Sequence, residues 1–253
     1  MTDRLPEDVG ILFLAGCPRT GTTALQEYLN VHHQVMVCRE RYKWIEPSAV
    51  TPTMFEPDRL LDFDRATERY RTDTRRMHMQ AILDSKSVAE LRWVGDKFPG
   101  YLRSIPTLAL ANPGARFIVT HRQVEPVVNS YLARAANEDD SWLGGRDVVD
   151  LAINTWNRSL LEFLAVLTDD DLAVLPVAYE AFHADPRMAA ARIGGFLDID
   201  MPDELVAEWR RRSDEHRQDR STDRYLTGDV LARIAHRADR DLEDRVLAAI
   251  ASS

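Results

Sequence analysis

A glycine-rich segment near the N-terminus, GCPRTGTT, has the residue types of a phosphate-binding loop. Gly16, Gly21 and the hydroxyl residue Thr23 have the spacing of a Walker A loop, and the apolar run ILFL precedes them. Glycines allow a tight turn, so that the backbone N–H groups from Thr20 to Ala24 point at one spot at the start of a helix. The segment therefore predicts an anion-binding loop; a glycine turn without a ligand is the alternative.

The lysine that a Walker A loop carries after its second glycine is absent. Thr22 stands where that lysine would contact the outer phosphates of ATP. Arg19 supplies a positive charge from within the loop instead. We therefore expect an anionic ligand that is bound without a metal ion.

A second pair of candidate anion ligands lies further along the chain, in FIVTHRQVEPVVNSYLARA. Arg122 ends an apolar strand pattern, and Ser130 lies two turns into the helix that follows. A guanidinium fork and a hydroxyl at such a corner can bind one anion together. Taken singly, Arg122 is a candidate for a surface ion pair and Ser130 for a solvent-facing helical residue. Together with the glycine loop, they predict a ligand that is phosphorylated at both ends.

Short apolar runs alternate with helical patterns over most of the chain. Strands are expected in ILFL, QVMVC, RWVGDKFPGY, ARFIVTHR and LAVLPV, and helices in TTALQEYLNVH, YLRSIPTLALANP, EPVVNSYLARAAN, DVVDLAINTWNRSLLEFLAVL and PRMAAARIGGFLDI. Alternation of this kind favours right-handed crossovers and a parallel sheet covered on both faces. We therefore expect an α/β protein with a three-layer αβα, P-loop-like architecture.

The whole chain, residues 1–253, is expected to form a single domain. The charged segment 51–90 has helical spacing interrupted by prolines, which indicates an inserted helical part and a wall of the substrate site. Residues 201–253 are expected to form helices, with a loop around 218–223 that covers the donor.

Four segments, taken in order, resemble sulfotransferases that use 3′-phosphoadenosine 5′-phosphosulfate. GCPRTGTTAL is similar to their P-[KR]-[ST]-G-T-[ST] loop for the 5′-phosphosulfate, and RFIVTHRQVEPVVNSYLARA to their Arg and Ser pair for the 3′-phosphate. VGDKFPGYL resembles the GDKTPxY or EKxxxY segment of bacterial and Golgi-type members, and VAYEAFHADP with IGGFLDI resembles a later stretch. The matches cover most of residues 11–200, whereas the KxHLP and RxGxxGxW segments of other branches are absent.

The resemblance implies metal-independent, in-line transfer of a sulfuryl group from this donor to a hydroxyl or amine of a small molecule or glycan. The donor ligands that it implies are Arg19, Thr20, Gly21, Thr22, Thr23, Arg122, Ser130, Tyr179 and Arg217. Arg19 and Lys97 would stabilise charge on the transferring group. For Tyr179, a ring buried beneath a strand end is the alternative to a place near adenine. Arg217 or Arg220 would close over the 3′-phosphate from the tail.

In-line transfer to an alcohol, phenol or amine also needs a base for the acceptor's proton. Glu40 is the candidate, because similar family members often place a catalytic glutamate just past the second strand. The alternative for Glu40 is a surface ion pair with Arg39 or Lys43. The alternative for Lys97 is a structural pair with Asp96 at the strand end.

The 253-residue chain has a formal net charge of −9 and two cysteines. Its acidity argues against nucleic-acid binding, so that an anionic ligand needs a local basic site. Apolar runs of signal-peptide or membrane-span length are missing, and two thiols do not form a disulfide framework. We expect a cytoplasmic protein without membrane insertion, whose oligomeric state the sequence does not predict.

Two other functions compete with sulfuryl transfer. A P-loop kinase that uses ATP and Mg²⁺ would need the lysine that Thr22 replaces. A non-catalytic relative of the same fold would bind the nucleotide without turning over any acceptor.

Overall fold

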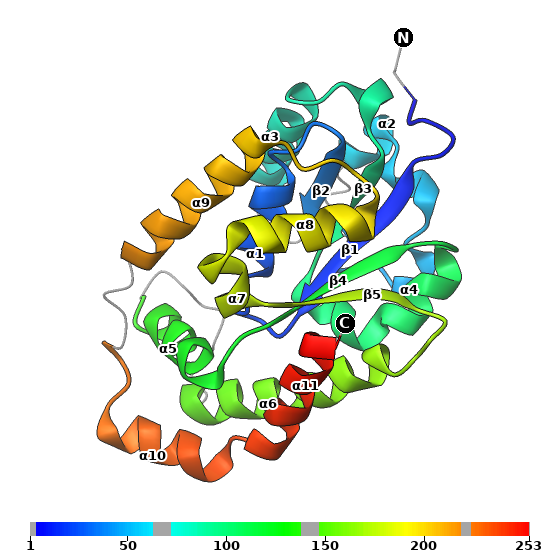
Figure 1. Ribbon diagram of the computed structural model, residues 1–253. Helices are drawn as coiled ribbons and strands as arrows, with labels where there is room; N and C mark the ends of the chain where they lie inside the picture. The colour runs from blue at the N-terminus through cyan, green and yellow to red at the C-terminus, as the bar shows by residue number, and fades with distance from the viewer. Residues whose placement is uncertain (1–3, 63–71, 138–146, 219–223, 253) are drawn as a thin grey trace.

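A five-stranded parallel sheet forms the centre of the computed structural model, which describes residues 4–62, 72–137, 147–218 and 224–252 (Figure 1). The strand order is β2-β3-β1-β4-β5. The strands are β1 (Gly10–Gly16), β2 (Val35–Arg39), β3 (Trp93–Lys97), β4 (Arg116–His121) and β5 (Ala173–Ala178). Because all the pairs are parallel, the five carboxyl ends lie at one edge of the sheet. The predicted parallel sheet is confirmed.

Helices connect the strands and form the C-terminal part of the chain. The α-helices are α1 (Thr22–Leu29), α2 (Pro57–Leu60), α3 (Thr72–Asp84), α4 (Ile105–Ala111), α5 (Val124–Ala135), α6 (Val148–Leu167), α7 (Tyr179–Ala184), α8 (Pro186–Leu197), α9 (Asp203–Gln218), α10 (Gly228–Arg237) and α11 (Arg240–Ser252). The 3₁₀ turns are η1 (Pro47–Ala49), η2 (Pro52–Phe55), η3 (Val88–Glu90) and η4 (Pro99–Ser104).

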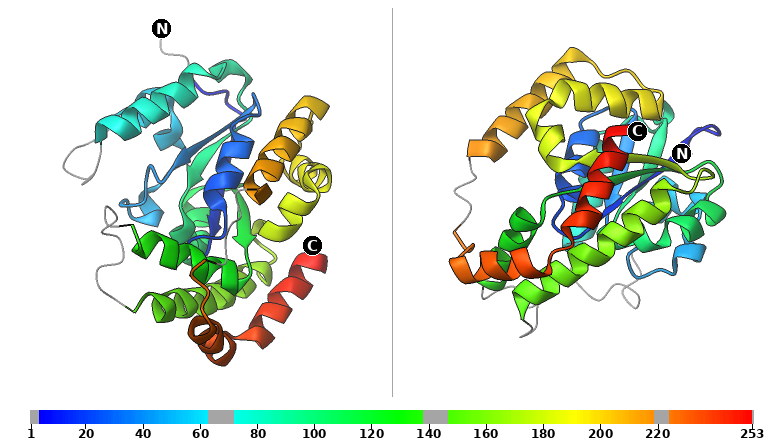
Figure 2. Two further views of the ribbon diagram at one scale, coloured as in Figure 1. Left: turned by 90° about the vertical axis from the view of Figure 1, so that its left-hand side faces the viewer. Right: turned by 60° about the horizontal axis from the view of Figure 1, so that its bottom comes forward.

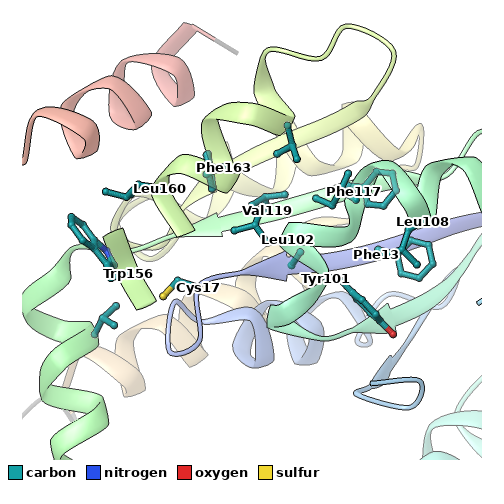
Figure 3. Packing of buried hydrophobic residues seen from close by; sticks show 14 of the residues in the cluster. Phe13, Cys17, Tyr101, Leu102, Leu108, Phe117, Val119, Trp156, Leu160 and Phe163 are labelled. Carbon is teal, nitrogen blue, oxygen red and sulfur yellow. The ribbon is translucent and has the colours of Figure 1, made fainter. Parts of the chain in front are cut away.

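The sheet is covered on both faces because its strands are apolar on both sides. In β1, Phe13 and Ala15 belong to the core shared with η4, α4 and α6, part of which is drawn in Figure 3. Leu12 and Leu14 face the other way, into the core shared with α1, α8 and α9. Alternate residues of a strand point to opposite faces, so a continuous apolar run is what a central strand requires. The three-layer αβα architecture is thereby confirmed.

The connections after β1 and β4 run on opposite faces of the sheet. Helix α1 packs into the core that contains Leu12, and α5 and α6 pack into the core that contains Phe13. Since β1 and β4 are neighbours, the chain leaves their carboxyl ends in opposite directions. Open α/β sheets have their ligand crevice at such a point.

The C-terminal part contributes to both faces. Helix α9 packs against α8, whereas α10 and α11 pack against α6 on the other face (Figure 2). In the segment 51–90, Phe55, Leu60 and Met79 are buried in the core on the α6 face. That segment therefore supports the sheet at its β2 end.

Candidate functional site

A cleft of about 900 Å³ opens at the carboxyl edge of the sheet. Segments far apart in the sequence meet there, namely the loop after β1, the turns after β2 and β3, the corner after β4 and the start of α7. Of the predicted site residues, the cleft is lined by Arg19, Gly21, Thr22, Thr23, Glu40, Lys97, Arg122, Ser130 and Tyr179. The fold thus brings together the candidates for both anion sites and for the base.

The glycine loop has the backbone that an anion nest requires. Arg19 and Gly21 have positive φ angles of 76° and 91°, and Gly21 caps α1 without a side-chain hydrogen bond. The first N–H groups of a helix have no acceptor within the helix. Thr22 and Thr23, the first two residues of α1, line the cleft. A Cβ on Gly21 would lie 2.2 Å from a ring carbon of Tyr179. Only glycine fits this position.

Thr20 supports the loop from beneath and does not line the cleft. Its hydroxyl donates to the carbonyl oxygen of Cys17 at 2.7 Å and lies 2.7 Å from the hydroxyl of Thr120 in β4. Its N–H also donates to Cys17. Thr20 is 1% exposed, and its side chain connects the loop to β4 instead of facing the cleft.

The two predicted anion sites meet at Arg19. The Arg19 Nε donates to the Ser130 hydroxyl on α5 at 2.8 Å, and Arg122 donates to the Arg19 carbonyl oxygen at 3.2 Å. The Arg122 guanidinium lies 4.3 Å from the centre of the Tyr179 ring, a cation–π contact. Tyr179 therefore packs between the loop and Arg122, as a wall of the cleft.

On the other side of the loop, Glu40 pairs with two lysines. Its carboxylate lies 3.2 Å from the Lys97 ammonium and 3.0 Å from that of Lys43. Burial alone would raise the pKa of Glu40, but the two ammonium groups outweigh it and lower that pKa below its ordinary value. Burial lowers the pKa of Lys97, against the effect of Glu40. Glu40 is therefore ionised near neutral pH, because the two lysines stabilise its charged form.

The structure places Glu40 and Lys97 in the cleft wall, where the Lys97 side chain is 2% exposed. Asp96, the neighbour of Lys97, is fully buried and accepts hydrogen bonds from the turn after β2 and from Tyr101, whereas the Lys97 ammonium pairs with Glu40. Of the alternatives for Glu40, the pair with Lys43 is present, and Arg39 contacts Glu27.

Several cationic residues of the cleft were not predicted as site residues. Lys43, Arg103, Arg134 and Arg158 line the cleft together with the predicted cations, while Glu40 and Glu162 are its only acidic lining residues in the described part of the chain. Arg134 lies four residues after Ser130 in α5, so helical spacing puts both on one face. The others come from separate segments, and only folding brings them together. The cleft is therefore basic in a chain of net charge −9.

Other predictions concern residues that the structure does not describe or does not bring to the cleft. The side chain of Arg217, the residue Arg220 and the loop 219–223 lie outside the described residues. Among the described side chains of residues 51–62 and 76–90, none lines the cleft. Over the described ranges, no His, Cys, Asp and Glu side chains cluster in a way that could hold a metal ion, and no helix is long and apolar enough to span a membrane.

Comparison with known proteins places this geometry in a family. The profile of the sulfotransferase family matches residues 12–203. "Protein-tyrosine sulfotransferase 1" of Danio rerio is 24% identical over 213 residues, which cover 79% of this chain and 56% of the relative. A "putative protein-tyrosine sulfotransferase" of Caenorhabditis briggsae is 22% identical over 214 residues, covering 78% of this chain and 68% of the relative. The match thus spans little more than half of the zebrafish protein.

Solved structures share the fold. The sulfotransferase domain from the curacin biosynthetic pathway has a TM-score of 0.52 at 16% identity, covering 80% of this chain and 77% of its own. Sulfotransferase STF9 from Mycobacterium avium has a TM-score of 0.51 at 18% identity, covering 85% and 70%. Mouse sulfotransferase SULT7A1, solved in complex with PAP, has a TM-score of 0.51 at 14% identity, covering 83% and 65%.

Proposed function

Since the chain belongs to the sulfotransferase family, we propose that it transfers a sulfuryl group from 3′-phosphoadenosine 5′-phosphosulfate to a hydroxyl or amine of an acceptor. The observation that carries the proposal is the meeting of two anion sites at Arg19, which belongs to the glycine loop and donates to Ser130 on α5. Arg122 reaches the same residue from β4. A nucleotide with an anionic group at each end fits this arrangement.

The residues present fit the chemistry of that donor. Backbone N–H groups at the start of α1 and the Arg19 guanidinium are hydrogen-bond donors for a phosphosulfate. Arg122 and Ser130 are the donors for a 3′-phosphate, which ATP lacks, so that binding of ATP would leave them unmatched. The loop has no lysine at Thr22, in agreement with a transferred group that needs no bridging metal ion.

The opposite wall supplies the groups for the transfer. The Glu40 carboxylate, ionised because of Lys97 and Lys43, is positioned to accept the proton of the acceptor's hydroxyl or amine. The Lys97 ammonium and the Arg19 guanidinium bring positive charge to the site of transfer. Negative charge develops there on the oxygen of the leaving group as the S–O bond breaks. The leaving group is adenosine 3′,5′-bisphosphate.

The acceptor is proposed to be a small molecule or glycan, with a tyrosine phenol as a further candidate in view of the two protein-tyrosine relatives. Exposed Trp44 and half-buried Phe98 line the cleft beside Glu40 and offer apolar contact to such a group. We place the reaction in the cytoplasm, which free buried Cys17 and Cys38 support.

Calorimetric titration with adenosine 3′,5′-bisphosphate tests the proposal directly. The wild type is expected to bind the bisphosphate and to bind ATP with Mg²⁺ far more weakly. Arg122→Ala is expected to lose about 2–5 kcal/mol of binding free energy, the cost of leaving a charged partner unmatched. Arg187→Ala, at an exposed arginine paired with Asp203, is the matched control and should bind normally.

The results also separate the competing functions. Binding of ATP with Mg²⁺ in preference to the bisphosphate would replace the proposal with a kinase. Tight binding of the bisphosphate without transfer to phenol, alcohol, amine or glycan acceptors would indicate a non-catalytic relative.

A further inference from the structure

Asp96 is a buried carboxylate that the proposed reaction does not use directly. It is 0% exposed and does not line the cleft. Its Oδ1 accepts hydrogen bonds from the N–H groups of Arg41 at 3.0 Å and Lys97 at 2.9 Å. Its Oδ2 accepts from the N–H of Tyr42 at 3.1 Å and from the Tyr101 hydroxyl at 2.7 Å. Burial raises the pKa of Asp96, against the effect of these donors, which stabilise its charged form.

Two of these donors belong to the residues that directly follow Glu40. Glu40 itself has a positive φ of 53°, a strained conformation for a residue that has a Cβ. Its N–H donates to the Lys97 carbonyl oxygen at 2.7 Å. The turn after β2 is therefore bonded to β3 at two points. The N–H of Glu40 bonds to Lys97, and the N–H groups of Arg41 and Tyr42 bond to Asp96.

The same carboxylate reaches a third part of the cleft wall. Tyr101 lies in η4, and Phe98, Pro99 and Gly100 around its start line the cleft. Asp96 therefore joins three segments at one point, namely the turn that carries Glu40, the end of β3 that carries Lys97, and η4. Displacing the turn that carries Glu40 or the end of β3 that carries Lys97 would change the distance between these two side chains.

We propose that Asp96 is the positioning residue of the reaction, which holds the Glu40 carboxylate against Lys97 through the backbone N–H groups of Arg41 and Tyr42. The proposal rests on the proposed function for the role of Glu40 as base. Its geometric content, the placing of Glu40 beside Lys97, can be measured without any acceptor.

The charge environment of Glu40 provides the readout. Lys97 and Lys43 face its carboxylate, and Asp96 and Arg39 act on Lys97 from β3 and β2. A Glu40 released from its place moves away from Lys97, and loss of an opposite charge within hydrogen-bonding distance raises a carboxyl pKa by roughly one unit or more. Core damage that leaves the pair intact would not move this pKa.

The experiment follows the Glu40 carboxyl by ¹³C NMR titration, with the resonance assigned by its loss in Glu40→Gln. In Asp96→Asn the amide has one acceptor oxygen where the carboxylate has two, and its NH₂ faces a donor. The Glu40 titration midpoint is expected to rise by roughly one pH unit in Asp96→Asn. Tyr101→Phe removes only the η4 hydroxyl and should leave the midpoint near that of the wild type.

The matched control is Asp198→Asn, at an exposed aspartate paired with Arg92 at the other side of the molecule. An unchanged midpoint in Asp96→Asn, or an equal rise in Tyr101→Phe, would overturn the proposal. If Asp96→Asn does not fold, amide hydrogen exchange in the wild type decides, because N–H groups bonded to a buried carboxylate exchange slowly. Fast exchange at Arg41 and Tyr42 would then overturn it.

Turnover separates this inference from the proposed function. With an acceptor that the wild type sulfates, Asp96→Asn is expected to lower kcat at least about tenfold while the bisphosphate dissociation constant stays within about twofold, the pattern of a lost transition-state interaction. A wild type that neither binds the bisphosphate nor transfers the group would refute the function, yet leave the NMR result on Glu40 placement valid.

Discussion

The two halves of the cleft differ in the source of their charge. One half, the proposed donor half, consists of the glycine loop and the start of α1, where backbone N–H groups have no acceptor within the helix and Gly21 is packed against Tyr179 so closely that no side chain fits. The other half, the proposed base half, contains the ion pair between buried Lys97 and half-buried Glu40, and the turn after Glu40 is attached to Asp96. The first half depends on chain conformation and the second on the charges of side chains.

This difference has consequences for pH and for mutation. Backbone dipoles do not titrate, so the loop should bind an anion over a wide pH range. The Glu40–Lys97 pair does titrate, and its balance depends on burial as well as on charge. Substitutions in the loop should therefore affect binding, and substitutions in the pair should affect turnover and its pH dependence.

Glu40→Gln is the largest expected effect. Loss of a positioned general base lowers kcat by about 10²–10⁴-fold, while binding of the bisphosphate by the other half should be unchanged. Rates and calorimetry on the same preparations check this, with exposed Glu46→Gln as the control. A large loss of bisphosphate affinity in Glu40→Gln would erase the division between the two halves.

Gly21→Ala should act on the donor half alone. The added methyl group would lie 2.2 Å from Tyr179, and the alanine would have to adopt a φ of 91°. This strain of roughly 1–3 kcal/mol is expected to displace the loop. Bisphosphate affinity is expected to fall by a similar free energy. In Gly195→Ala, where no atom lies within 4 Å of the added Cβ, affinity should not change. Equal affinities in both variants would show that the loop conformation does not decide binding.

Glu243→Gln tests a titrating group that lies near the corner after β4. Glu243 on α11 lies 3.6 Å from His121, next to Arg122, and bonds to Arg240. Burial raises the pKa of Glu243, but His121 and Arg240 outweigh it and lower that pKa below its unfolded value of 4.5. The carboxylate therefore stabilises the fold above about pH 4.5, and this contribution is lost as the pH falls through the folded-state pKa.

Urea unfolding of this variant should show a loss of about 1–3 kcal/mol at neutral pH. The gap from the wild type should narrow as the pH falls below 4.5, the unfolded value. A gap that stays constant down to strongly acidic pH would contradict the assigned charge of Glu243.

Lys43→Gln is expected to have the smallest effect, and it tests how much Lys43 contributes to the lowered pKa of Glu40. Lys43 is one of two cations that lower the pKa of Glu40, and its ammonium is partly exposed. Without it, the acid limb of the pH–kcat profile should move upward by less than about one pH unit, since Lys97 remains. A limb that does not move would mean that Lys97 alone sets the ionisation of Glu40.

Local sequence patterns predicted the strands and the glycine loop, because each depends on neighbours in the chain, and most of the predicted site residues line the cleft. Gly16, Gly21 and the apolar run before them are sufficient to predict a strand, a tight turn and a helix start. The corner that carries Arg122 and Ser130 is predicted in the same way. By contrast, the bonds from Asp96 to Arg41 and Tyr42 join positions more than fifty residues apart, which no local pattern reveals.

The amino-acid sequence alone determined the alternation of strands and helices, the glycine turn before α1 and the order of the family-like segments, because backbone conformation and apolar periodicity are local properties. Only the tertiary structure decided that Thr20 faces Thr120 rather than the cleft, that Glu40 meets Lys97 and Lys43, and that Asp96 holds their turn. Those outcomes depend on which strands become neighbours and which charges share a low-dielectric space, and the burial that sets both exists only once the sheet has formed.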